Sequence, residues 1–134
     1  MAKWQGTSER ILILSGEDDH RKILANEVRR SGWKASPCAS LEEAKLLLAE
    51  EHYAAALCDD DLAGDNFVSA IAPIKRLANS TPVIVVSRRD DWDSYMIALA
   101  AGAADYLAFP PYPGEVEQSL GKTAKVFGSL AHAA

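Results

Sequence analysis

The chain has 134 residues, of which 49% are hydrophobic and 25% charged, a composition typical of a globular protein with a single domain. Its 14 basic and 19 acidic residues give a formal net charge of −5, which argues against nucleic acid as the main partner because phosphate binding needs a basic face. No apolar run approaches the roughly 20 residues of a membrane span and no signal-peptide pattern is visible, so we expect a cytoplasmic protein without membrane contact. Cys38 and Cys58 lack the spacing of a zinc site and are expected to be reduced.

Short apolar runs recur along the chain. Three of them are apolar at successive positions, as in parallel strands that are covered on both faces, and they span 11–14, 54–58 and 82–86. Two weaker runs, at 34–36 and 105–108, fit shorter or edge strands. The sequence therefore predicts five strands.

Helical patterns separate these runs, at 20–32, 40–51, 66–80, 91–102 and 111–128. The first helix is expected to turn one apolar face inward with Ile23, Leu24 and Val28. Ser40 and Glu43 form the S-x-x-E capping box that opens the second helix. Pro73 lies inside the third pattern and predicts a kink or a break there.

Strict alternation of five strands and five helices predicts an α/β fold with a parallel sheet. At this length we expect a flavodoxin-like, doubly wound sandwich with strand order 2-1-3-4-5. The predicted domain covers residues 9–127, and the polar or small residues at 1–8 and 128–134 are interpreted as tails.

Ligands of such sheets bind beyond the carboxyl ends of the strands, where the strand order reverses. Asp59 directly follows the third predicted strand, so its carboxylate is expected in the central crevice. Asp60 and Asp61 are expected to continue into a loop that turns at Gly64, with Asp60 serving solubility or packing. The acids Asp18 and Asp19, with His20, precede a helix, and we interpret them as favourable charges at its N-terminus.

Four segments together carry a resemblance to a known family. They are "ILILSGEDDHRKILANEVRRSGW" from residue 11, "YAAALCDDDLAGDN" from residue 53, "TPVIVVS" from residue 81 and "AAGAADYLAFPP" from residue 100. In this order and spacing the chain resembles the receiver domain of two-component response regulators. The resemblance places Asp59 at the phosphoacceptor, Ser87 at the hydroxyl that bonds a phosphoryl oxygen, Tyr106 at the switch aromatic and a cis bond between Phe109 and Pro110.

The same resemblance shows which family residues are replaced. Ser15 and Gly16 stand where the family has an acidic pair that holds Mg²⁺, and Phe109 stands where it has a lysine. The remaining candidate metal ligands are Asp59, the carbonyl of Asp61 and Glu17, which imply weak Mg²⁺ binding at most. Arg88 or Arg89 could replace the lysine charge.

The sequence therefore predicts an atypical receiver with a degenerate pocket that signals by protein–protein interaction and is not a metabolic enzyme. The alternative is a phosphorylation-competent receiver, switched by a histidine kinase with unusual Mg²⁺ ligation. A histidine kinase or another signalling protein is the expected partner. An apolar stripe on the fourth helix predicts an effector or homodimer surface on the face of helix four, strand five and helix five: Trp92, Tyr95, Met96 and Leu99.

Other ligand classes of the same architecture fit less well. Ile23 stands where a cobalamin-binding loop of the D-x-H-x-x-G type needs glycine, and three acids follow Ser15-Gly16 where a flavodoxin binds phosphate. No G-x-G-x-x-G or P-loop motif occurs, so a nucleotide site is not expected.

Overall fold

The computed structural model describes residues 9–60, 67–78, 80–89 and 91–124. For residues 67 and 68 it describes the backbone alone. Within these ranges, strands and helices alternate along the chain. The elements are β1 (Arg10–Leu14), α1 (Asp18–Arg30), β2 (Lys34–Cys38), α2 (Leu41–Glu50), β3 (Ala55–Asp59), α3 (Phe67–Leu77), β4 (Val83–Ser87), α4 (Trp92–Ala100), β5 (Asp105–Ala108) and α5 (Glu115–Thr123).

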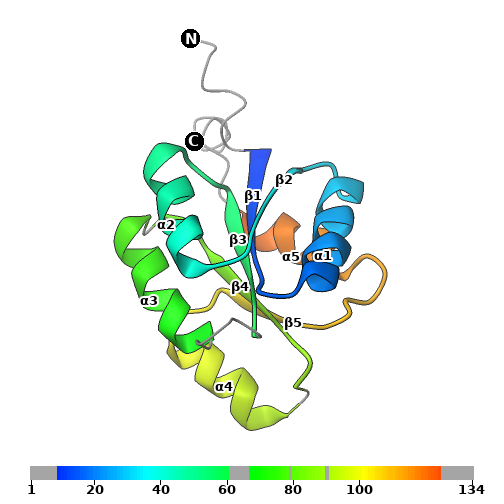
Figure 1. The fold of residues 1–134 in the computed structure, drawn as a ribbon. Helices are drawn as coiled ribbons and strands as arrows, with labels where there is room; N and C mark the ends of the chain where they lie inside the picture. Colours follow the sequence, from blue (N-terminus) through cyan, green and yellow to red (C-terminus); the bar gives the residue numbers. More distant parts are fainter. Residues whose placement is uncertain (1–8, 61–66, 79, 90, 125–134) are drawn as a thin grey trace, which may run out of the picture.

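The strands form one parallel sheet in the order β2-β1-β3-β4-β5. The helices α1 and α5 cover one face of this sheet, and α2, α3 and α4 cover the other (Figure 1). Each face has its own apolar core, because the central strands alternate side chains between the two faces. The predicted doubly wound architecture and strand order are confirmed, and the strand ends differ from the predicted ones by two residues at most.

The strand register explains why the two cysteines remain thiols. Cys38 on β2 and Cys58 on β3 flank the same residue of β1, Leu14, so a whole strand separates them. Both are free and buried. Burial raises the pKa of the Cys38 thiol to about 12, and it also raises the pKa of Cys58, so neither is a reactive thiolate.

Local side-chain contacts fix the helix starts. The hydroxyl of Ser40 accepts a hydrogen bond from the Glu43 amide at 3.2 Å, as the predicted capping box requires. The Glu43 carboxylate, however, accepts from the amide of Ala39 at 2.9 Å, one residue before the cap. Asp91 caps α4 by accepting from the amide of Ser94 at 2.7 Å.

One helix prediction is wrong in detail, and for another the structure excludes one of its two alternatives. Ile23 is 39% exposed, because α1 turns Leu24, Ala25 and Val28 onto the sheet and the neighbouring position on a helix points about 100° away. The chain of α3 is not broken at Pro73, since the helix runs from Phe67 to Leu77 across it. Ile71 and Ile74, both fully buried, anchor the helix to the sheet on either side of the proline.

No helix among the described ranges is long and apolar enough to cross a membrane. The residues interpreted as tails, 1–8 and 128–134, lie outside the described residues, as does the turn predicted at Gly64.

Candidate functional site

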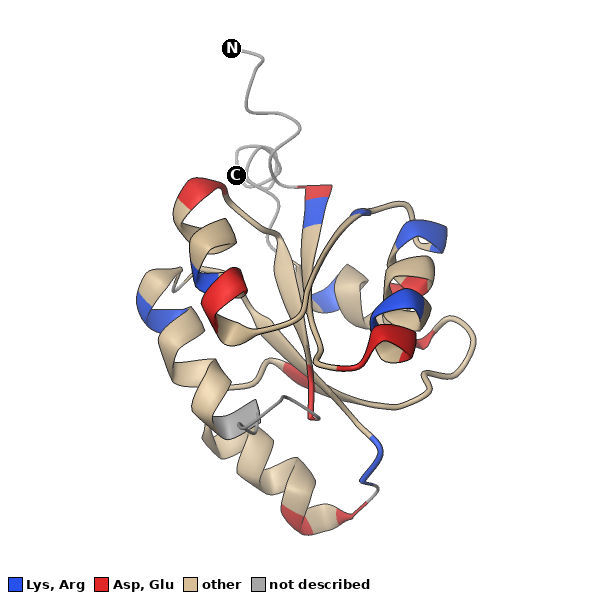
Figure 2. Cartoon of the chain, viewed as in Figure 1, with Lys and Arg blue, Asp and Glu red and all other residues tan. Residues whose placement is uncertain are grey.

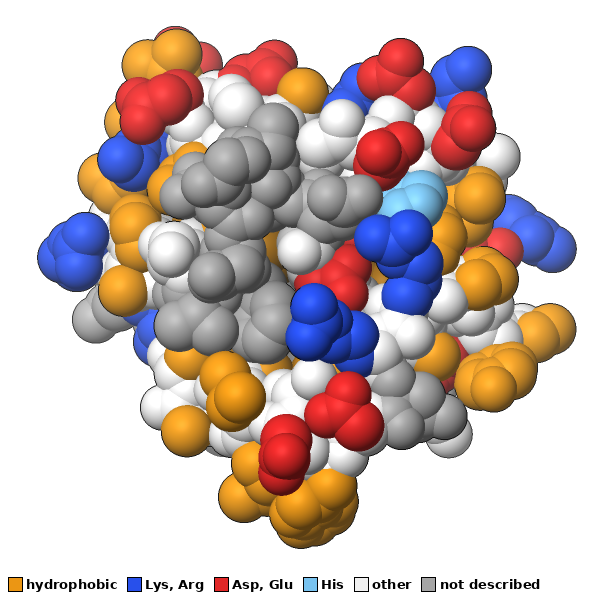
Figure 3. Space-filling view, turned by 60° about the horizontal axis from the view of Figure 1, so that its bottom comes forward, with side chains coloured by type: hydrophobic (Ala, Val, Ile, Leu, Met, Phe, Trp, Pro, Cys, Tyr) orange, Lys and Arg blue, Asp and Glu red, His pale blue; other side chains and the backbone are white. Residues whose placement is uncertain are grey.

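The carboxyl ends of the central strands bring the candidate residues together at one end of the sheet. Asp59 is the last residue of β3, Ser87 the last of β4, and Ser15 directly follows β1. Figure 2 shows acidic residues at the end of β3 and basic residues just after β4 at this same end. In the view onto this end, a histidine lies beside acidic and basic side chains near the middle of the face (Figure 3).

Asp59 is fully buried and its carboxylate is held by two donors. The hydroxyl of Ser15 donates to Oδ2 at 2.6 Å, and Nδ1 of His20 lies 2.7 Å from the same oxygen. Because a carboxylate only accepts, Nδ1 is the donor in this second contact. Asp59 therefore faces β1 and the start of α1, and it does not lie open in the crevice.

Burial dominates the titration of this carboxyl. The loss of hydration raises the pKa of Asp59 above its ordinary value of 3.8, although the hydrogen bonds from Ser15 and His20 act in the opposite direction. A contact with the side chain of Asp60 raises it further. The pocket therefore disfavours additional negative charge on Asp59.

The second aspartate, Asp60, is the carboxylate that contacts Ser87, the predicted phosphoryl-binding hydroxyl. The hydroxyl of Ser87 donates to Oδ2 of Asp60 at 2.6 Å, and the amide of Arg88 donates to that oxygen at 3.3 Å. The amide of Arg89 in turn donates to the Ser87 hydroxyl at 2.9 Å. Asp60 thus ties β3 to the loop after β4, a packing role of the kind predicted for it.

Tyr106, the candidate switch aromatic, links this loop to α4. Its hydroxyl donates to the carbonyl of Arg89 at 2.9 Å. Its ring meets the ring of Tyr95 edge-on, with the centroids 5.8 Å apart. The residue is partly buried, and its placement joins the strand ends to the α4 surface.

His20 is the site residue that the sequence analysis missed. We had interpreted it with Asp18 and Asp19 as part of a helix N-terminus, and those two acids do lie in the first turn of α1. The signal that could have found it is its place in that turn, because helical side chains lean toward the N-terminus and so toward the strand ends. Its ring also stacks on Phe109, with centroids 4.1 Å apart and planes tilted by 32°.

The described residues do not by themselves form a complete site for a divalent cation. Within 9–60, 67–78, 80–89 and 91–124, no three His, Cys, Asp or Glu side chains are placed to hold a metal ion together. Glu17 stands at the N-cap position of α1, where its exposed side chain makes no capping hydrogen bond, and Asp61 lies outside the described residues. Mg²⁺ requires several oxygen ligands around it, whereas the donors on Asp59 are a hydroxyl and a ring nitrogen.

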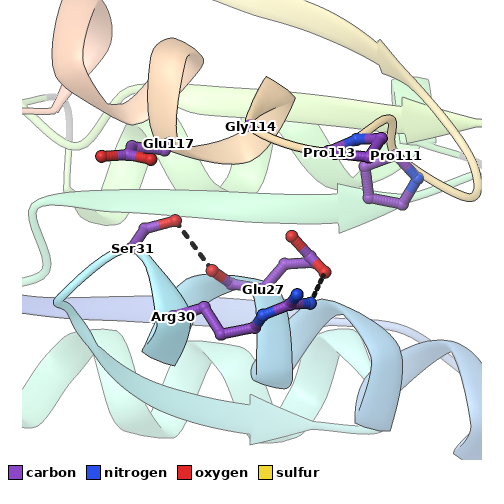
Figure 4. Close-up of a pocket in the computed structure, with 7 residues that line it drawn as sticks. All are labelled: Glu27, Arg30, Ser31, Pro111, Pro113, Gly114 and Glu117. Atoms are coloured by element: carbon purple, nitrogen blue, oxygen red, sulfur yellow. Dashed lines mark hydrogen bonds and ion pairs between the residues drawn. The ribbon is translucent and has the colours of Figure 1, made fainter.

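A pocket of about 290 Å³ lies elsewhere, between α1 and the segment that precedes α5 (Figure 4). Glu27 forms its floor and is already bonded to Arg30 at 2.8 Å and, through its carbonyl, to the hydroxyl of Ser31 at 2.8 Å. Pro111 and Pro113 line the opposite wall. None of the candidate site residues contributes to this pocket, so the chemistry of the chain is not assigned to it.

The fold and the site together define a class. A five-stranded doubly wound sheet that carries an aspartate at the end of β3, a serine at the end of β4 and a tyrosine on β5 is the architecture of a receiver-type signalling domain. The model of the response regulator receiver domain matches residues 11–120, so the chain belongs to that family of two-component systems. The bond between Phe109 and Pro110 is cis, as the resemblance implied.

Individual relatives agree with this assignment. The chain is 30% identical over 104 residues to the transcriptional regulatory protein PrrA of Mycobacterium tuberculosis, covering 78% of this chain and 45% of PrrA. It therefore spans about half the length of the curated relatives it matches.

Solved structures show the same fold. A putative response regulator from Chloroflexus aurantiacus superimposes with a TM-score of 0.76 at 26% identity, over 86% of this chain and 99% of that one. A response regulator from Burkholderia pseudomallei, solved with a phosphorylated aspartic acid and a calcium ion, has a TM-score of 0.73 at 22% identity, over 94% and 72% of the two chains.

Proposed function

We propose that this chain is an atypical receiver that signals by protein–protein contact without Mg²⁺-dependent phosphorylation of Asp59. The observation that carries the proposal is the state of the Asp59 carboxylate, which is fully buried and accepts hydrogen bonds from both Ser15 and His20. A phosphoryl group that bonds to Oδ2 would have to displace these donors. That oxygen is therefore already fully engaged in the resting pocket.

Electrostatics supports the same conclusion. Phosphoryl transfer depends on positive groups that stabilise the charge on the transferred oxygens. A phosphorylated aspartate would bring close to two negative charges into a pocket where burial already raises the pKa of Asp59. Phe109 offers no donor there, and the side chains of Arg88 and Arg89 are exposed.

The surface for partners is proposed on α4 and β5. Trp92 is 70% exposed, Ile97 52% and Met96 43%, which is unusual for large apolar side chains so close together on one helix. Figure 3 shows hydrophobic side chains gathered at its lower end, where α4 begins. Tyr95 packs against both Trp92 and Tyr106, so the patch connects to the strand ends.

This patch suits a histidine kinase, another signalling protein or a second copy of the chain. Aromatic side chains that are exposed in the free protein are the residues that contribute most to such interfaces. The exposure of Trp92 agrees with the surface stripe predicted on this helix, whereas a Trp92 packed into the core would have argued against it.

The test is an amide NMR titration of the chain with millimolar Mg²⁺ and then with Mg²⁺ plus beryllofluoride, a phosphoryl mimic. We expect the resonances around Asp59, Ser87 and Tyr106 to stay unchanged. Shifts that vanish in Asp59→Ala would contradict the proposal and establish the alternative, a phosphorylation-competent receiver with unusual Mg²⁺ ligation.

An Asp60→Ala variant belongs in the same experiment, because the Ser87 hydroxyl bonds Asp60 in this structure. A response that survives Asp59→Ala but is lost in Asp60→Ala would assign the reactive carboxylate to the second aspartate. That outcome would also contradict the proposal.

A further inference from the structure

His20 reaches Asp59 from the first turn of α1. Its side chain is only 14% exposed, and Nδ1 lies 2.7 Å from Oδ2 of a carboxylate with no exposed surface. The two residues are 39 positions apart in the sequence, so the contact joins α1 to the end of β3. Such a buried contact is expected to be both strong and specific, because water does not compete for it.

Phe109 holds the imidazole from the other side. The two rings stack with centroids 4.1 Å apart, and Phe109 packs against the core on the α1–α5 face of the sheet. The backbone fixes Phe109 in turn, since its amide donates to the carbonyl of Ser87 at 2.9 Å. The imidazole is therefore oriented by a hydrogen bond at one atom and by a ring contact on one face.

The contacts of Ser15 and His20 occupy both lone pairs of Oδ2 of Asp59. A carboxylate oxygen has two lone pairs in its plane, and Ser15 and His20 place one donor on each. A divalent cation that binds this oxygen must displace one of the donors. The Asp60 oxygen nearest to the loop after β4 is likewise engaged, by Ser87 and the Arg88 amide.

We propose that His20 is a positioning residue that stands in for a divalent cation at Oδ2 of Asp59 and thereby excludes one from that oxygen. The ring of Phe109 packs against the imidazole and keeps it next to Asp59. The proposal rests on the proposed function, because it explains how a receiver pocket without its metal ligands keeps a buried carboxylate satisfied.

The decisive test restores one missing acid and asks whether His20 still competes with the metal. In a Gly16→Asp background, which keeps the Ser15 donor on Oδ2, Mg²⁺ affinity is measured by calorimetry with His20 present and with His20→Leu. We expect the His20→Leu chain to bind Mg²⁺ at least about tenfold more tightly, because the competing donor is gone. Gly16 is exposed and its φ is not positive, so its backbone tolerates a side chain. If Gly16→Asp does not fold, Gly16→Glu serves as the background.

Two variants show whether the effect comes from the donor. His20→Asn places an amide nitrogen close to where Nδ1 lies, so we expect it to keep Mg²⁺ out as His20 does. His52→Leu removes a histidine at the far end of the sheet and should leave the affinity unchanged. Equal Mg²⁺ affinity with and without His20, or an Asn variant that behaves like Leu, would overturn the proposal.

A second measurement uses the native chain. The proton on Nδ1 of His20 should be visible by ¹⁵N NMR with slow exchange, and it should be lost in Asp59→Ala and in Phe109→Ala. An Nδ1 atom that carries no proton in the native chain would overturn the proposal. The proposed function fails separately, through a response of the native chain to Mg²⁺ and beryllofluoride.

Discussion

The two halves of the strand-end crevice use neighbouring aspartates in different ways. On the β1 side, Asp59 is sealed between Ser15 and His20. On the β4 side, Asp60 is partly exposed and holds the hydroxyl of Ser87. The amide of Asp60 still donates to the carbonyl of Val86 at 3.0 Å, and the two neighbouring carboxylates touch each other while they bond different partners. The neighbouring residues Asp59 and Asp60 therefore belong to two different sites, one closed and one partly exposed.

The comparison also separates the positions that the resemblance marks as replaced from those that it marks as kept. The family positions that differ, Ser15, Gly16 and Phe109, all lie on the sealed half or against His20. The positions that agree, Ser87 and Tyr106, lie on the open half and lead to the exposed aromatic surface of α4. We infer that the replacements act together as one unit around Asp59.

The largest effect should come from removing both donors of the sealed half. Ser15→Ala/His20→Leu takes two hydrogen-bond donors away from a buried carboxylate, which should lower the free energy of unfolding by about 3 kcal/mol or more. Urea unfolding at neutral pH measures this loss. Adding Asp59→Asn should recover part of it, because the buried charge is then removed.

A matched control keeps this result specific. Ser31→Ala/His52→Leu changes the same residue types away from the Asp59 site and should cost about 1 kcal/mol, because Ser31 loses its hydrogen bond to the Glu27 carbonyl. If the pocket variant costs no more than this control, Asp59 is hydrated in solution, and the contrast between the two halves is wrong.

A smaller loss is expected on the open half. Ser87→Ala removes the hydrogen bond to Asp60 and the acceptor of the Arg89 amide, at a cost of about 1 kcal/mol. Ser87→Thr keeps the hydroxyl and should stay close to the native stability. A Ser87→Ala variant that loses as much stability as the double variant of the sealed half would show that the two halves are equally closed.

The pH dependence of stability should differ between the pocket and the surface. The pKa of Asp59 is raised by burial, so its contribution to stability is full below about 3.8 and is lost as the pH rises through the folded-state value. The native chain should therefore lose stability relative to Asp59→Asn across that range and run parallel to it above. Unfolding by urea at a series of pH values measures the slope.

Asp91 is a control, because its pKa is shifted in the opposite direction to that of Asp59. Hydrogen bonds from Ser94 lower the pKa of this exposed carboxyl, so its contribution is present above 3.8 and is lost as the pH falls. Asp91→Asn should therefore differ from the native chain at neutral pH and converge with it in acid. Curves of the same sign for Asp59→Asn and Asp91→Asn would contradict the assigned burial of Asp59.

The smallest effect on stability is expected at Trp92. Its ring is mostly exposed, so Trp92→Ala should change the free energy of unfolding by less than about 0.5 kcal/mol. The same variant should weaken self-association or partner binding, which light scattering over a concentration series detects. Tyr112→Ala, at an equally exposed aromatic away from α4, should leave association unchanged. A native chain that stays monomeric at all concentrations would remove the homodimer from the proposal.

The sequence predicted most of the framework because it depends on local patterns. Continuous apolar runs predicted the central strands, and Ser40 with Glu43 predicted the start of α2. The strand alternation predicted the order of the sheet and therefore placed Asp59, Ser15 and Ser87 at one end. The errors lie where neighbouring positions compete, as at Ile23, where only packing decided which side of α1 faces the sheet.

What only the tertiary structure decided is the pairing of side chains at that end. The sequence by itself determined that Asp59 and Asp60 follow a central strand, but not which of them meets Ser87 and which meets Ser15. It gave no partner to His20, because a contact across 39 residues depends on the angle between α1 and the sheet. Burial determines how the side chain of an aspartate at a strand end is rotated. It also determines in which direction a histidine on a helix points. Water is excluded there, and Oδ2 of each aspartate is bonded by the donors that the fold brings within reach, whereas Oδ1 of Asp60 is buried without a hydrogen-bond partner among the described residues.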